Sequence, residues 1–395
     1  MLTKVAESKI LKRRISGALA SVNQEDWNLV LDGRNIYLSI PYLKALEKGM
    51  EGHMKFFFSI SYNERKEPVL IAVFVRVKFV DKRRKFADSI FKMRFPFKKR
   101  FEDIFTINAL TCGNVFSAGE NGMIWSEEIE PSLAFEEINT VVEALTIEQD
   151  LKNQVSLNVF KDFWSQTVPY SNALKDKGYF DFKIDVNMVL TINEAWHTME
   201  DYLGSMKTKF RTRAHSVYKK SNPLVLKSLN AADIIEQGER IRVLFEKVLE
   251  KSAYHIGTIT PDTFAACKEN LGGDFEFKAY FLDGLMVGFS TSFMNTHSLD
   301  ANYVGLDYAY NEQYDIYQRI LYDYVEQALK TGVKELQLGR TSELIKSAIG
   351  AVPKDMMLYI KHKRKLSNLV LKNVIKSVAP SAYDLRKPFK ANFIN

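Results

Sequence analysis

One stretch, from Phe275 to Ala351, constrains the fold of this 395-residue chain more than any other. It begins with two apolar runs, Phe275–Leu282 and Leu285–Met294, joined by Asp283-Gly284. An Asp-Gly pair between such runs is typical of a two-residue hairpin turn, because both positions tolerate a positive φ. The stretch therefore predicts a β-hairpin at its start.

The remainder of this stretch alternates between strand and helix. Ala301–Tyr310 is strand-like, and apolar residues recur every three or four positions through Asp315–Thr331, which predicts an amphipathic helix. Gly332 stands where a helix C-cap glycine belongs, and Val333–Leu338 indicates a short buried strand. The order of hairpin, strand, helix and strand predicts a mixed α/β sheet.

The residues that precede the hairpin extend this pattern. Phe182–Ile192 indicates a strand, and Thr198 begins a helix in which Asp201 completes a capping-box pattern. Asp233–Lys251 indicates a further helical stretch. After Thr198, apolar residues at steps of three and four predict one buried helical stripe: Leu203, Met206, Phe210, Ala214 and Val217.

The first half of the chain shows a looser version of the same order. We expect residues 1–35 to be helical and peripheral, with strands at Lys55–Ser61, Val69–Phe79, Ile104–Val115 and Ser156–Phe160 and a helix at Leu133–Glu148. The repeated order predicts two related domains, 1–175 and 180–362, followed by a basic amphipathic tail at 363–395. The alternative is one large α/β domain with insertions.

Composition limits the compartment and the class of partner. The two cysteines form no CxxC pair and the six histidines are scattered singly, so we expect a reducing, cytoplasmic location and no metal. The N-terminus lacks the apolar core of a secretory signal. The net charge of +7 is concentrated in three basic segments, which suggests anionic partners: Lys82–Phe101, Lys207–Lys220 and Lys354–Lys390.

Two of these basic segments also carry large apolar side chains. Lys82–Phe101 interleaves cations with phenylalanines, and the run from Lys361 through Lys376 has leucines and valines among its lysines. Such mixtures favour an anionic membrane surface, so we expect peripheral attachment to the inner membrane face. Single-stranded nucleic acid ranks lower, because no nucleic-acid module accompanies them. Surface loops packed on the body are the remaining alternative.

The order of motifs after residue 180 resembles the N-acetyltransferase (GNAT) superfamily. Lys278-Ala279-Tyr280-Phe281-Leu282-Asp283-Gly284 is similar to its central hairpin, and Gly339, Lys346 and Gly350 follow the pattern of its FemAB-like branch. The basic helix Leu203–Lys220 is similar to the helix before that branch's catalytic core. The resemblance implies tandem GNAT-like domains, the C-terminal one catalytic, with no permanently bound cofactor.

Two departures narrow the activity that this resemblance implies. The usual acetyl-CoA pyrophosphate loop is absent from the second half, and no long heptad arm is present. What remains is an N-acyltransferase that moves an acyl group from acyl-CoA or acyl carrier protein to an amine on a lipid or cell-envelope precursor. The alternatives are an aminoacyl-tRNA-dependent aminoacyltransferase of the peptidoglycan-bridge type and a non-catalytic GNAT-like binding module.

Candidate site residues fall into three groups. For proton removal we consider Asp307 or Asp300, or a water held by Tyr303, because alternation along the predicted strand puts Tyr303 and Asp307 on one face; His255 and His297 are weaker candidates. Lys346 joins Asp307 and Tyr303 as a catalytic candidate. For the donor's anion we expect Gly339, Arg340, Thr341 and Ser342, since Thr341 or Ser342 can cap the next helix and leave its N–H groups free. For an acidic substrate group we expect Lys207, Arg211 and Arg213, whose alternative role is a solvated helix face.

Overall fold

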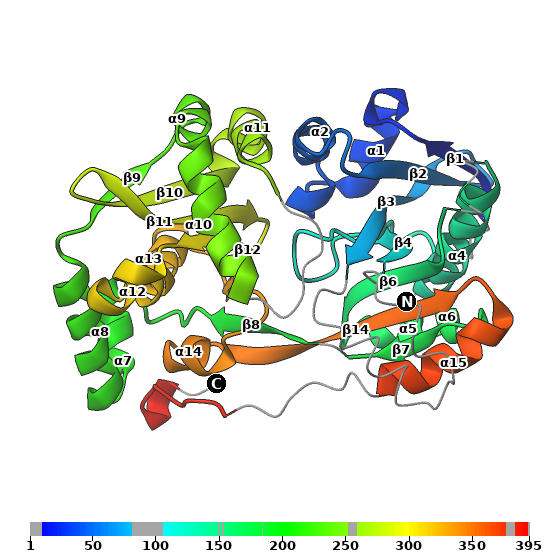
Figure 1. Cartoon of the computed structure of the whole chain (residues 1–395). Helices are drawn as coiled ribbons and strands as arrows, with labels where there is room; N and C mark the ends of the chain where they lie inside the picture. The colour runs from blue at the N-terminus through cyan, green and yellow to red at the C-terminus, as the bar shows by residue number, and fades with distance from the viewer. Residues whose placement is uncertain are drawn as a thin grey trace, which may run out of the picture. The chain divides into compact units, whose positions relative to one another are not determined.

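The computed structural model describes residues 10–80, 106–148, 151, 154–183, 185–251, 259–376 and 384–393. The chain divides into two compact units, each with its own sheet (Figure 1). The first unit holds the described residues up to 183 together with 355–376, and the second holds 185–251, 259–354 and 384–393. The basic segment Lys82–Phe101 lies outside the described residues.

The first unit has one mixed sheet with the strand order β1-β2-β3-β4-β6-β14. Neighbouring strands are antiparallel except β4 and β6, which are parallel. Short strands β5 and β7 pair with β3 and β14. The elements are β1 (Ile10–Ser16), α1 (Gln24–Leu31), α2 (Ile40–Gly49), β2 (Lys55–Asn63), β3 (Pro68–Val80), β4 (Thr106–Cys112), β5 (Met123–Trp125), α4 (Pro131–Glu148), β6 (Leu157–Trp164), α5 (Val168–Ser171), α6 (Ala173–Asp176), β7 (Phe180–Phe182), β14 (Val352–His362) and α15 (Lys365–Lys376).

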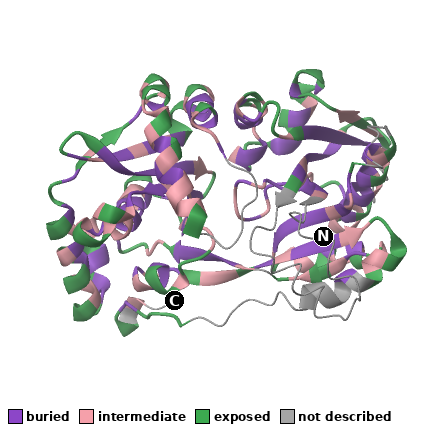
Figure 2. Cartoon of the chain, viewed as in Figure 1, coloured by how far each residue is buried: buried purple, intermediate pink, exposed green. Residues whose placement is uncertain are grey.

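The second unit has the strand order β8-β13-β12-β11-β10-β9, in which only β12 and β13 are parallel. Helix α13 packs its apolar stripe into the core. Figure 2 shows most of β8, β10, β11 and β12 as buried. The elements are β8 (Val186–Thr191), α7 (Met199–Ser205), α8 (Thr208–Ser221), β9 (Val225–Ser228), α9 (Ala231–Glu236), α10 (Gly238–Lys251), α11 (Pro261–Leu271), β10 (Phe275–Leu282), β11 (Leu285–Asn295), β12 (Ser298–Leu306), α12 (Tyr308–Tyr314), α13 (Ile316–Thr331), β13 (Glu335–Gln337) and α14 (Glu343–Ala348).

Several local signals in the sequence are confirmed. Asp283 and Gly284 both have positive φ and join β10 to β11. Gly332 ends α13 in the left-handed conformation, and Thr198 and Asp201 form the capping box of α7. Each of these signals works through backbone groups of immediate neighbours, which explains why the sequence alone reveals it.

Other local predictions are corrected. Residues 10–16 form strand β1 instead of a helix, because they pair with β2 and Arg13 binds the buried Glu137 of α4 through two hydrogen bonds. The expected single helix after Thr198 is two helices, since Met206 and Lys207 adopt extended backbone between α7 and α8. The predicted strand Ala301–Tyr310 stops at Leu306.

Candidate functional site

The second unit contains a point where its two parallel strands part. Strands β12 and β13 pair over only three residues, ending at Asp300 opposite Gln337. Beyond that pair the chain after β13 follows β8 instead: the Leu338 amide donates to the Met188 carbonyl at 2.8 Å, and the Met188 amide donates to the Gly339 carbonyl at 3.0 Å. The hydrogen-bond ladder between β12 and β13 therefore opens here, with Ala301 on one side and Gly339 on the other. We call this opening the seam.

On the β13 side of the seam, few heavy atoms lie close to the backbone of Gly339. A Cβ added to Gly339, whose φ is +72°, would have only the Ala301 carbonyl oxygen within 4 Å, at 3.8 Å. The positive φ suits glycine, because other residues enter the left-handed region at a cost. Gly339 therefore lets the chain turn away from β12 without filling the seam.

Lys346 of α14 lies beside the seam and is buried. Its Nζ donates to the carbonyl oxygens of Gly339, at 3.3 Å, and Arg340, at 2.6 Å. Burial lowers the pKa of Lys346 to about 7, although Glu343 and Asp185 act in the opposite direction. A neutral amine has two N–H donors and one lone pair, so both donors are satisfied here and the lone pair remains to accept a proton.

The loop before α14 has a strained backbone, and none of its side chains caps the helix. Ser342 occupies the N-cap position, but its side chain caps no helical N–H, and Thr341 and Ser342 have φ values of +63° and +58°. Instead Ser342 forms a hydrogen bond with Tyr317 of α13, which opposes the rise that burial causes in the Tyr317 pKa. The expected side-chain cap is therefore wrong, and α14, with six residues, is too short to carry the anion site assigned to its start.

Arg340 points its charge toward an acidic neighbour. Its Nη1 lies 4.0 Å from Oδ2 of Asp185, and both side chains are about one-quarter exposed. Asp185 immediately precedes β8, so this pair brackets the seam from the β8 side. The structure thus places four of the predicted residues close together: Gly339, Arg340, Ser342 and Lys346. The amine of Lys346, however, donates to backbone carbonyl groups and not to an anion-binding position.

Asp307 and Tyr303 lie apart from that group. Asp307 follows β12 as the N-cap of α12 and pairs with Arg240 and Lys247 of α10, each at 2.8 Å. Burial alone would raise the pKa of Asp307, but the hydrogen bonds from Lys247 and Arg240 lower it. A carboxylate that is paired with two cations is a poor proton acceptor near neutral pH, so Asp307 is a poor candidate for the base. Tyr303 packs edge-on against Phe245, with ring centroids 5.6 Å apart.

Two of the three basic residues predicted to bind an acidic substrate group, at the start of α8 and within it, have partners in the second unit. Lys207 Nζ donates to the Lys387 carbonyl at 3.0 Å, and Arg213 binds Asp315 at 2.9 Å and Gln318 at 2.8 Å. Arg211 is half-buried on the same helix. Two of the three residues assigned to an acidic substrate therefore help to hold the second unit together, and their substrate role stays a prediction.

Three residues at the seam were missed by the sequence analysis: Asp185, Asn187 and Gln337. Asn187 is fully buried within β8, and its Nδ2 donates to Oε1 of Gln337 at 3.0 Å. One signal was available, because Asn187 interrupts the otherwise apolar run Val186–Leu190. Their proximity depends on the pairing of β8 with β13, which crosses 150 positions of sequence.

Comparison with known proteins supports the architecture. No protein-family model matches the sequence, and neither does any curated protein. Among solved structures, the chain aligns with the C-terminal domain of a putative lysylphosphatidylglycerol synthetase from Agrobacterium fabrum over 90% of this chain and 96% of that one, at 10% identity and a TM-score of 0.50. It aligns with FemX over 88% and 97%, at 9% identity and a TM-score of 0.52.

A tandem GNAT protein from the clavulanic acid biosynthesis pathway also aligns, over 89% of this chain and 98% of that one, at 8% identity and a TM-score of 0.49. Likeness at such identities concerns the fold. The chain shares the two-unit mixed α/β fold of the synthetase domain and of FemX, and we call its units GNAT-like after the resemblance of its sequence motifs.

The two GNAT-like units differ at their parallel strands. In the first unit, β4 and β6 pair over four residues, ending at Cys112 opposite Phe160. Beyond that pair the side chain of Lys161 fills the space, so that a Cβ on Gly113 would overlap it. Lys161 donates to the carbonyls of Asn114, at 2.7 Å, and Ser117, at 2.8 Å, and pairs with the buried Asp162. The first GNAT-like unit closes this position with its own residues.

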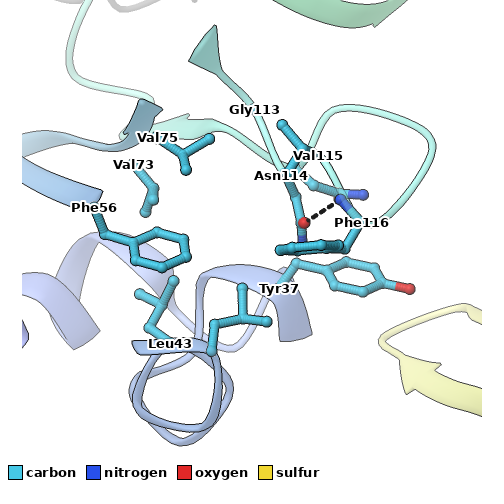
Figure 3. Close-up of a pocket in the computed structure, with 11 residues that line it drawn as sticks. Tyr37, Leu43, Phe56, Val73, Val75, Gly113, Asn114, Val115 and Phe116 are labelled. Atoms are coloured by element: carbon cyan, nitrogen blue, oxygen red, sulfur yellow. Dashed lines mark hydrogen bonds between the residues drawn. The ribbon is translucent and has the colours of Figure 1, made fainter. Parts of the chain in front are cut away.

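A small cavity lies near the closed position in the first GNAT-like unit (Figure 3). Its apolar wall includes Phe56 and Val75, and Asn114 turns its side chain toward the Phe116 amide, 2.8 Å away. The free volume is about 10 Å³, the room of about one water molecule. This cavity is therefore too small for an acyl chain. We take the seam of the second unit as the candidate active site, because the buried Lys346 lies beside it.

Proposed function

We propose that the chain is an N-acyltransferase that moves an acyl group from a thioester, carried by coenzyme A or an acyl carrier protein, to an amine. The observation that carries the proposal is the pairing of an open seam with Lys346, a buried amine whose pKa is lowered to about 7. A general base works best when its pKa is near the operating pH. The tandem GNAT-like fold supports the same class of reaction.

The reaction assigns one task to each group. The acceptor nitrogen attacks the thioester carbonyl carbon, the new C–N bond forms, and the C–S bond breaks to release a thiolate. Neutral Lys346 takes the proton lost by the nitrogen and returns it to the leaving sulfur. The carbonyls of Gly339 and Arg340 hold the Nζ group in place, which fixes the direction of its lone pair.

A lipid amine is the acceptor that we favour. The fold is similar to a domain whose name, lysylphosphatidylglycerol synthetase, places a phospholipid in its product. The exposed leucines of α15, next to the basic residues Lys363, Arg364 and Lys365, fit a protein that works at an anionic membrane surface. Among the described residues, no helix is both long and apolar enough to cross a bilayer.

Aminoacyl transfer is the second candidate function. The likeness to FemX extends over 88% of this chain, and the Gly339, Lys346 and Gly350 pattern resembles the FemAB-like branch. In that case the donor is an aminoacyl-tRNA. Sensitivity of the activity to ribonuclease distinguishes the two donors, since a coenzyme A thioester contains no RNA strand to cut.

Two experiments test the proposal. Mass spectrometry of lipid and envelope extracts from cells with and without the gene identifies the product without prior choice of substrate. In purified protein, Lys346→Ala should lower the rate of thioester consumption by more than about tenfold while the protein stays folded, because the base is lost. The wild-type rate should rise with pH through about 7 as Lys346 becomes neutral. An unchanged rate in the variant removes Lys346 from the mechanism.

Arg340→Ala in the same assay tests whether Arg340, which lies near Asp185, also helps to bind the donor.

A further inference from the structure

A chain of hydrogen-bonded polar side chains, buried except for the half-buried Gln337, crosses three strands next to the seam. Asn187 of β8 donates to Gln337 of β13 at 3.0 Å, and Gln337 Nε2 donates to Ser298 Oγ of β12 at 3.4 Å. Ser298 Oγ donates to Asp300 Oδ1 at 2.6 Å, and Asn295 Nδ2 lies 3.5 Å from Asp300 Oδ2. Gln337 and Asp300 are the last residues that pair before β12 and β13 part.

The hydrogen bonds in this chain all run in one direction, toward Asp300. Ser298 gives its single hydroxyl proton to Oδ1 of Asp300. The Ser298 oxygen then accepts from Gln337, which must present its NH₂ group to serine and its oxygen to Asn187. Asn187 is therefore bound to turn its NH₂ group toward Gln337, and its carbonyl oxygen faces away from the chain of bonds.

That carbonyl oxygen, Oδ1 of Asn187, is buried and has no hydrogen-bond partner. A buried acceptor that stays unpaired destabilises the fold, so the arrangement is unfavourable for a purely structural asparagine. Three residues at the same end of β8 and β13 are only half-buried: Asp185, Gln337 and Arg340. The next residue, Met188, shares the Gly339 carbonyl with Lys346 Nζ.

We propose that Asn187 Oδ1 binds the acceptor nitrogen by accepting one of its N–H bonds, with Gln337, Ser298 and Asp300 as positioning residues. This inference rests on the proposed acyl transfer and specifies how that site recognises its acceptor. The substrate class is a primary amine, which keeps one N–H for Asn187 while it gives another proton to Lys346. A tertiary amine offers no such N–H in its reactive, neutral form.

The test measures binding apart from turnover. We titrate n-octylamine into the full chain by calorimetry at pH 9 and compare wild type with Asn187→Leu. We expect the leucine variant to bind octylamine about tenfold more weakly, the size of one lost hydrogen bond to a buried group. Equal affinity in the two proteins, or no binding to either, overturns the inference.

A matched control is available in the first unit. Asn139 of α4 is also buried, also donates one hydrogen bond, to Glu143 at 3.0 Å, and also has an unpartnered Oδ1. Asn139→Leu should leave octylamine affinity unchanged. An equal loss of affinity in both variants indicates a general effect of the substitution and overturns the specific role of Asn187.

Turnover separates this inference from the proposed function. We measure release of coenzyme A from palmitoyl-CoA with and without octylamine. Asn187→Leu should lose most of the acceleration by octylamine, through a higher KM, whereas the control Asn139→Leu should keep both the release without amine and the acceleration within about twofold of wild type. If wild type binds octylamine through Asn187 but consumes no thioester, the amine site stands and the acyl-transfer proposal fails.

Discussion

Lys346 shows how one residue can be costly to the fold and useful to the chemistry. Its side chain is buried, and the amine donates only to two backbone carbonyls. The pKa falls from 10.5 to about 7 because burial penalises the charged form. Below pH 7 the lysine is protonated in both folded and unfolded chains, and the full penalty applies to the folded state.

This penalty predicts a pH-dependent gain from Lys346→Met. Between about pH 7 and 10.5 the unfolded chain binds more protons at this site than the folded chain, so wild-type stability rises with pH across that window. We expect the methionine variant to be more stable than wild type at pH 6, by about 2–4 kcal/mol, and this difference to shrink by pH 10. Urea unfolding at both pH values measures it; a difference that does not change with pH contradicts the lowered pKa.

At the scale of elements, what the sequence predicts depends on how far apart the interacting residues are. The hairpin at Asp283-Gly284, the helix end at Gly332 and the capping box at Thr198 are confirmed, because each involves close neighbours. The end of β12 is missed, because the pairing of Asp307 with α10 depends on residues 60 or more positions away. For the same reason local spacing could suggest Lys346 and Gly339 as candidates, and it could not suggest Asn187.

Helix α15 lies in one of the two basic and apolar segments that we predict to bind a membrane surface, and it exposes two leucines. Leu366 and Leu369 are 80% and 67% exposed, and residues three apart lie on one helical face. Inserting both into a bilayer interface should add to the attraction of the adjacent lysines for anionic lipid. We expect Leu366→Asp with Leu369→Asp to reduce co-sedimentation with phosphatidylglycerol vesicles by at least about tenfold.

The control for this experiment uses exposed apolar residues elsewhere in the same unit. Leu29 of α1 and Ile147 of α4 are 70% and 79% exposed, so Leu29→Asp with Ile147→Asp changes the charge equally. Vesicle binding of this control should match wild type. Similar losses in the two double variants trace the effect to net charge, and unaltered binding of the α15 variant removes this helix from the membrane surface.

At the scale of the whole molecule, the two GNAT-like units have a similar arrangement at their parallel strands but differ in the partners of the lysine that lies there. Each has one parallel strand pair, and a buried lysine donates to two backbone carbonyls beside it. Lys161 has a carboxylate partner, Asp162, and fills the space beyond its strand pair. Lys346 instead donates to the carbonyls of Gly339 and Arg340, and we assign the proposed reaction to the second unit.

The path of the chain gives the last prediction. The first unit takes β14 from the far end of the sequence: β14 pairs with β6 and β7 and contributes Tyr359, a fully buried residue bonded to Ser171 at 2.8 Å. A fragment of residues 1–183 lacks this strand and exposes one edge of β6. We expect it to show no cooperative unfolding transition by circular dichroism, because it loses the strand that pairs with both β6 and β7 and leaves an edge of β6 unpaired.

Rejoining the missing strand should restore the fold of this unit. Phe182 of β7 lies opposite Leu358 of β14, and Lys183 forms an ion pair with Asp355, so a short Gly-Ser linker can connect residue 183 to residue 355. We expect residues 1–183 linked in this way to 355–376 to unfold cooperatively on heating. A cooperative transition in the unlinked fragment would show that the first unit is complete without β14, and the absence of one in the linked chain would show that further segments are needed.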